Sequence, residues 1–84
     1  MSAPEIVGAR LIEESHTTGR GGKRHWHSTY RADDGGEIVI TRHRDRTALV
    51  TVLDADGSRR EFRESNAGDD RWLLAVVGYR LQAA

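Results

Sequence analysis

Three histidines are the residues whose type and spacing come nearest to a metal site. His25 and His27 are separated by one residue, so both imidazoles lie on one face if this segment is a strand. A hairpin that closes within residues 19–23 would place His16 across from that pair. Three neutral imidazoles with an open fourth position are typical of zinc. Because this spacing alone is a weak signal, we favour ordinary solvated histidines and expect no metal or other cofactor.

Side chains that could act in hydrolysis are present, but their contexts do not predict catalysis. No serine of the chain lies in a Gly-x-Ser-x-Gly context. Asp33, Asp34, Asp54 and Asp56 fall in expected turns, where aspartate usually serves the turn geometry. A chain of 84 residues also rarely encloses a large ligand pocket. We therefore predict a protein that is not an enzyme.

Basic and aromatic residues are interleaved between His16 and Ala32, a segment without any acidic residue. Arginine binds phosphate bidentately, and exposed aromatic rings on a sheet stack on unpaired bases. In the competing interpretation the aromatic residues belong to the core, because so small a chain has few large apolar residues to spare. The candidate residues for binding nucleic acid or a partner are Arg20, Lys23, Arg24, Trp26, Tyr30, Arg31, Arg42, Arg44 and Arg46.

Composition restricts the classes of function. The 13 basic and 13 acidic residues give a formal net charge of +0, which argues against a general polyanion binder. The absence of cysteine excludes disulfides and thiolate metal sites. No apolar run approaches the roughly 20 residues of a membrane span, and the first residues lack the features of a signal peptide. We expect a cytoplasmic protein without membrane contacts.

Short alternating runs separated by Gly/Asp turns predict a sheet. We expect strands over about 6–16, 25–32, 37–42, 47–53 and 58–64, and a mobile, basic, glycine-rich loop over about 17–24. The first strand has an alternative, because Ser2 to Glu5 resembles a capping box and residues 5–16 would then begin as a short helix.

The segment 67–81 predicts an amphipathic helix. Leu73, Val76 and Leu81 recur on one helical face. Gly78 is unfavourable there, since a glycine inside a helix costs about 1 kcal/mol relative to alanine. A helix of this length is marginal alone in water, so it must pack on the sheet.

These elements predict one small α+β domain over residues 1–84. It is an antiparallel β-meander of four to five strands with one C-terminal α-helix packed on one face. A single helix covers only part of such a sheet, which leaves surface for another chain. We expect a non-enzymatic binding module that acts through protein–protein contacts, homodimerisation included. Nucleic-acid binding by the segment Arg20–Arg31 is the alternative.

Overall fold

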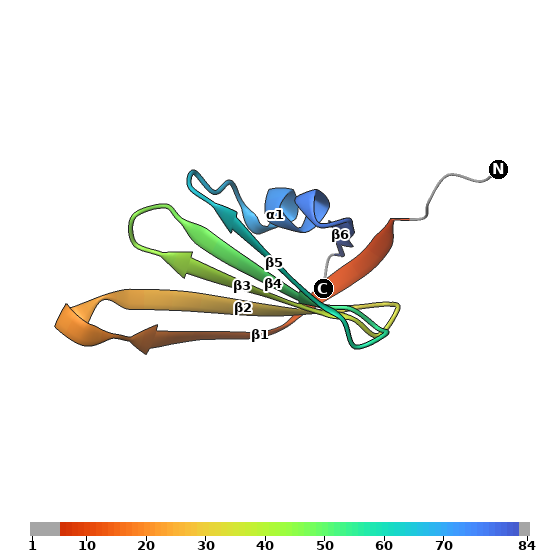
Figure 1. The fold of residues 1–84 in the computed structure, drawn as a ribbon, viewed down its shortest axis with the longest axis horizontal. Helices are drawn as coiled ribbons and strands as arrows, with labels where there is room; N and C mark the ends of the chain where they lie inside the picture. The colour runs from red at the N-terminus through yellow and green to blue at the C-terminus, as the bar shows by residue number, and fades with distance from the viewer. Residues whose placement is uncertain (1–5, 83–84) are drawn as a thin grey trace.

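A computed structural model describes residues 6–82 of the chain. It is a small α+β domain in which one α-helix lies on one face of a six-stranded sheet, so the predicted fold class is confirmed (Figure 1). The strands are β1 (Val7–Thr18), β2 (Arg24–Ala32), β3 (Glu37–His43), β4 (Ala48–Leu53), β5 (Arg59–Glu64) and β6 (Tyr79–Leu81), and the helices are the 3-10 turn η1 (Arg20–Gly22) and α1 (Asp70–Val76).

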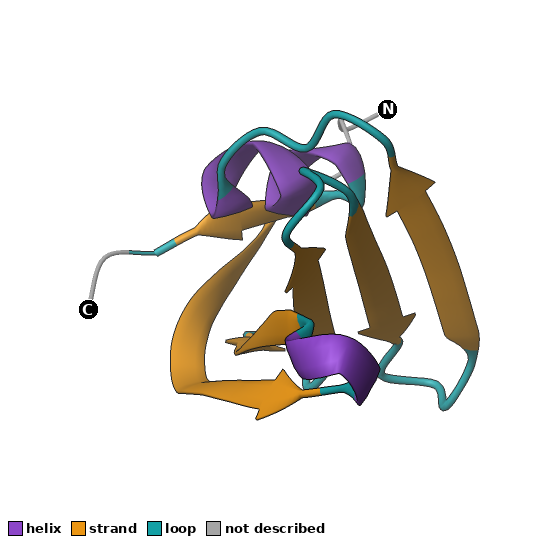
Figure 2. Cartoon of the chain, turned by 90° about the vertical axis from the view of Figure 1, so that its left-hand side faces the viewer, coloured by secondary structure: helices purple, strands orange, loops and turns teal. Residues whose placement is uncertain are grey.

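The sheet has the strand order β5-β4-β3-β2-β1-β6. The first five strands are each antiparallel to the next in sequence, whereas β6 pairs in parallel with the start of β1. Figure 2 shows that the sheet curls, with α1 lying over its concave side. The prediction of four to five strands is therefore too low, because the last strand comes from the segment expected to be helical.

The predicted helix over 67–81 is wrong in its length. Helix α1 has 7 residues, and the chain reverses at Gly78, whose φ of 96° lies in the left-handed region that favours glycine. The next residues then find backbone partners on β1, with Val7 opposite Tyr79. Val76 is consequently 46% exposed instead of lying on the buried face.

The hydrophobic core lies between α1 and the inner, concave face of the sheet. Strands β3 and β4 contribute their inward-facing residues by simple alternation, because partners across the ladder share a face. Phe62 of β5 packs against this core and is partly buried. The core comprises Ala9, Tyr30, Ala32, Ile38, Ile40, Ala48, Val50, Val52, Leu73, Leu74, Val77 and Tyr79.

Strand β1 and strand β2 form a long hairpin that gives the molecule its 52 Å long axis. The strand interpretation of the N-terminal segment is confirmed from Val7 onward, whereas the capping box at residues 2–5 lies outside the described residues. The expected loop over 17–24 is shorter, since the backbone N–H of Gly19 donates to the carbonyl of Lys23 at 2.7 Å. In Figure 1 this hairpin reaches beyond the turn between β3 and β4.

None of the helices within residues 6–82 is long and apolar enough to cross a membrane.

Candidate functional site

Two acids stand at the start of α1, and the second of them, Asp70, binds two of the predicted binding residues. Asp69 caps the helix by accepting from the backbone N–H of Trp72 at 2.9 Å. Asp70 accepts a hydrogen bond from the Tyr30 hydroxyl and two from Arg42, whose Nε lies 3.0 Å from Oδ1. Burial, and then the Asp70 carboxylate, raise the pKa of Tyr30. Tyr30 and Arg42 thus fasten α1 to the sheet.

Trp26 lies on the same sheet face as Tyr30 but beyond the part that α1 covers. Trp26 is 43% exposed, whereas Tyr30 is 3% exposed. The strand register places Trp26 between His16 on β1 and Arg42 on β3. The core interpretation therefore holds for Tyr30, whereas Trp26 remains exposed. Trp26 offers an accessible ring flanked by basic side chains, and such a ring can stack on a planar ligand.

The turn after β1 and the turn after β3 meet at one end of the sheet and form a basic depression of about 540 Å³. We call this the basic end. Three predicted residues line it, and two further ones, Arg20 and Arg46, lie in the same two turns. The lining residues are Lys23, Arg24, His25, His43, Arg44, Asp45 and Thr47.

Two histidine rings meet in this depression. The Nδ1 atoms of His25 and His43 are 2.6 Å apart, and the rings form an edge-to-face pair at 86° with centroids 4.7 Å apart. The sequence analysis missed His43 as a partner of His25. The signal that would have found it is the hairpin register, because these two residues face each other across β2 and β3.

The proposed grouping of His16, His25 and His27 is wrong. His16 pairs with Trp26 across the β1–β2 ladder, so it lies on the opposite face from the other two histidines. His27 instead interacts with the hydroxyls of Thr17 at 3.0 Å and Thr41 at 3.1 Å. Among residues 6–82, no three histidine, cysteine or acidic side chains are placed to hold a metal ion.

Arg31 is separated from the other predicted basic residues. It lies at the far end of β2, opposite Arg10 on β1 and Glu37 on β3. Residue alternation places it on the outer face of the sheet, away from Tyr30. The run Arg20–Arg31 is therefore not one surface, because a strand of nine residues carries its two ends about 25–30 Å apart.

The outer edge of β1 is largely without a neighbouring strand. β6 pairs with it over Val7–Ala9 only, so the edge from residue 10 to residue 18 has no strand partner in the described part of the chain. Leu11 is 42% exposed and Ile12 is 44% exposed beside a register shift in the β1–β2 pairing. The sequence analysis expected an uncovered sheet face and did not identify this edge.

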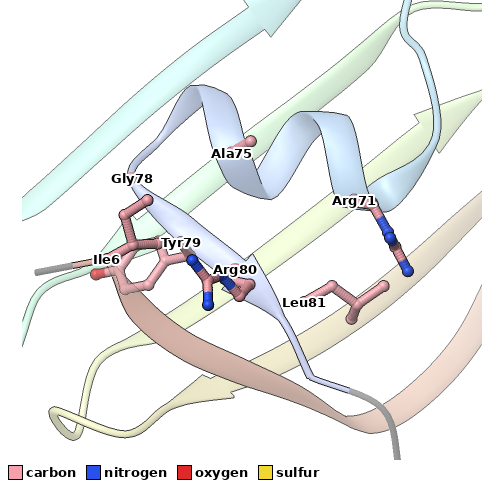
Figure 3. Close-up of a pocket in the computed structure, with 7 residues that line it drawn as sticks. All are labelled: Ile6, Arg71, Ala75, Gly78, Tyr79, Arg80 and Leu81. Atoms are coloured by element: carbon pink, nitrogen blue, oxygen red, sulfur yellow. The ribbon is translucent and has the colours of Figure 1, made fainter.

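A second hollow, of about 380 Å³, lies where α1 turns back into β6 (Figure 3). Its lining is mostly apolar, and the two arginines in it, Arg71 and Arg80, are among the residues labelled in Figure 3. None of the predicted site residues lines it. The hollow lies along the seam between two consecutive elements, α1 and β6.

Comparisons of the chain with protein-family models, with curated proteins and with solved structures found no match.

Proposed function

We propose that the protein is a non-enzymatic binding module that acts through contact with another protein chain, with a second copy of itself as the first candidate. The observation that carries this proposal is the edge of β1 from residue 10 to residue 18, which has no strand partner among residues 6–82. These nine residues present a row of backbone N–H and C=O groups roughly 30 Å long. Such an edge pairs readily with a strand of another chain.

The side chains along this edge support the same proposal. Leu11 and Ile12 expose apolar surface next to the free backbone groups. If two copies of β1 pair antiparallel about Ile12, Arg10 of each copy comes opposite Glu14 of the other. Opposite charges facing each other across two strands are favourable. The strand at the opposite edge of the sheet, β5, carries five charged residues among its six, which discourages pairing there.

Self-association through β1 predicts that the apparent mass rises with concentration between about 1 μM and 1 mM. Ile12→Lys places a charge on the edge and should raise the dimer dissociation constant about tenfold or more. Leu53→Lys is the matched control, because Leu53 is similarly exposed at 48% but lies on the inner strand β4. Sedimentation velocity measures both variants. A strict monomer over the whole range contradicts the second copy as partner.

Nucleic-acid binding is the second candidate function, favoured by the convergence of Lys23, Arg24 and Arg44 at the basic end. The exposed Trp26 follows two residues after Arg24 on β2 and lies on the same sheet face as Arg24, opposite to the face of His25. A single strand held by Arg24 at this end of the sheet would therefore have a ring on which to stack. The balanced net charge of the chain opposes this candidate, and for that reason we place it second.

If the protein binds single strands, log K should fall linearly with log salt, by about 0.7 for each phosphate neutralised. Trp26→Leu should weaken binding by about 1–3 kcal/mol through lost stacking while leaving the salt slope unchanged. Fluorescence anisotropy of a labelled oligonucleotide measures both quantities. Undetectable binding even at low salt would eliminate this candidate.

A further inference from the structure

We infer that the depression at the basic end is a phosphate-binding site, formed by Lys23, Arg24 and Arg44 around the His25–His43 pair. The inference rests on the second candidate function, for which it names the phosphate contact. The chemistry recognised is a phosphate group, whether in the backbone of a single-stranded nucleic acid or in a free polyphosphate.

The charges of the depression are unbalanced in favour of an anion. Three permanent cations and one carboxylate, that of Asp45, line it, so the local charge is 3 − 1 = +2 with neutral imidazoles. Within residues 6–82 the ion pairs within 4.0 Å involve other arginines, namely Arg10, Arg42, Arg59 and Arg60. The three cations of the depression therefore have no counterion of their own there.

Asp45 forms no ion pair within 4.0 Å with these cations, because its carboxylate is hydrogen-bonded within its own turn. Its Oδ1 accepts from the hydroxyl of Thr47 at 2.5 Å and from the backbone N–H of Thr47 at 3.1 Å. These hydrogen bonds lower the pKa of Asp45, so it stays ionised and bound to the turn. The acid shapes the β3–β4 turn, and the cations remain open to an external anion.

The histidine pair adds a hydrogen-bond donor and a mechanical link. At 2.6 Å, one Nδ1 must carry a hydrogen and the other must accept it. The accepting ring, when neutral, then carries its hydrogen on Nε2, so at least one Nε2–H donor is present on the pair. Because His25 and His43 join the ends of β2 and β3, the pair also holds the two cationic turns together.

The composition of the site suits phosphate better than a lone carboxylate. Two arginines, one from each turn, offer planar forks that bind phosphate oxygens bidentately, and Lys23 adds a point charge. A depression of about 540 Å³ has room for more than one phosphate group. The cations come from turns about 20 residues apart in sequence, so a bridging anion would reduce their mutual repulsion.

The test is a titration of the full chain with inorganic tripolyphosphate and, separately, with a single-stranded oligonucleotide of about 12 nucleotides, both at low salt. Amide chemical shifts and calorimetry follow binding. The wild type should bind tripolyphosphate, with the largest shifts in the turns around Lys23 and Arg44. Arg24→Gln and Arg44→Gln should each weaken it about tenfold, because a charge-assisted hydrogen bond is lost. Arg80→Gln, an exposed cation on β6, should change it less than about twofold.

The outcomes distinguish failure of the phosphate site from failure of the nucleic-acid candidate. If neither ligand binds, both the inference and the nucleic-acid candidate are overturned. If the oligonucleotide binds equally well to Arg24→Gln, Arg44→Gln and the wild type, the site is overturned and nucleic-acid binding lies elsewhere on the protein. If tripolyphosphate binding depends on both arginines and the oligonucleotide does not bind, the site is supported as one for free polyphosphate. A thermal unfolding curve for each variant establishes that it is folded.

Discussion

A chain that ends at Asp69 is expected to lose cooperative unfolding altogether. Truncation there removes α1 and β6, and with them four buried core residues: Leu73, Leu74, Val77 and Tyr79. Burying each such side chain contributes about 1.5–3 kcal/mol, so the loss is about 6–12 kcal/mol. A small domain has a total stability of only about 5–15 kcal/mol. The five remaining strands would expose their inner face to water.

Thermal unfolding by circular dichroism and the dispersion of amide resonances measure this effect. Two single substitutions in α1 serve as graded controls. Leu74→Ala removes a fully buried side chain and should cost about 2–5 kcal/mol. Val76→Ala truncates a side chain that is 46% exposed and should cost less than about 1 kcal/mol. A truncated chain with a cooperative transition would show that the sheet folds without its helix.

The strands could be predicted from the sequence because their signals are local. In β4, Val50 and Val52 alternate with less buried residues, and the turns beside it contain Asp and Gly. The glycine in the last segment was also recognised as unfavourable for a helix. The chain reverses at Gly78, and the sequence analysis missed this role. The strand β6 that follows forms only by pairing with β1, about 70 residues earlier, and no local pattern encodes that contact.

The candidate site required information on register that periodicity does not supply. Alternation placed His25 and His27 on one face, but only the β1–β2 pairing assigns His16 to the other face. Likewise, the sequence analysis counted Arg42 among the candidate binding residues. The structure brings Asp70 to it from 28 residues away, so this cation stabilises the fold and is already paired. The basic end depends on the same kind of long-range alignment, between His25 and His43.

The two buried tyrosines predict a marked loss of stability in alkali. Burial raises the pKa of Tyr30, with the Asp70 carboxylate as the next cause, and burial followed by the charges of Asp34 and Asp54 raises that of Tyr79. Below about pH 10 both tyrosines are protonated in the folded and unfolded chains, so they add no pH dependence. Above about pH 10 the unfolded chain releases protons that the folded chain retains. The free energy of unfolding should then fall with pH, by at most about 1.4 kcal/mol per pH unit for each tyrosine.

Urea unfolding at several values between about pH 8 and pH 11 measures this slope. Tyr30→Phe should reduce stability at about pH 8, because the hydrogen bond to Asp70 is lost, yet it should make the alkaline slope shallower. Tyr79→Phe should also make it shallower, and the chain has no other tyrosine. The slope, unlike the stability at one pH, is insensitive to packing lost in the variants. An unchanged slope in Tyr30→Phe would mean that the hydroxyl is as free to ionise in the folded protein as in water, and that Asp70 does not hold α1 to the sheet through it.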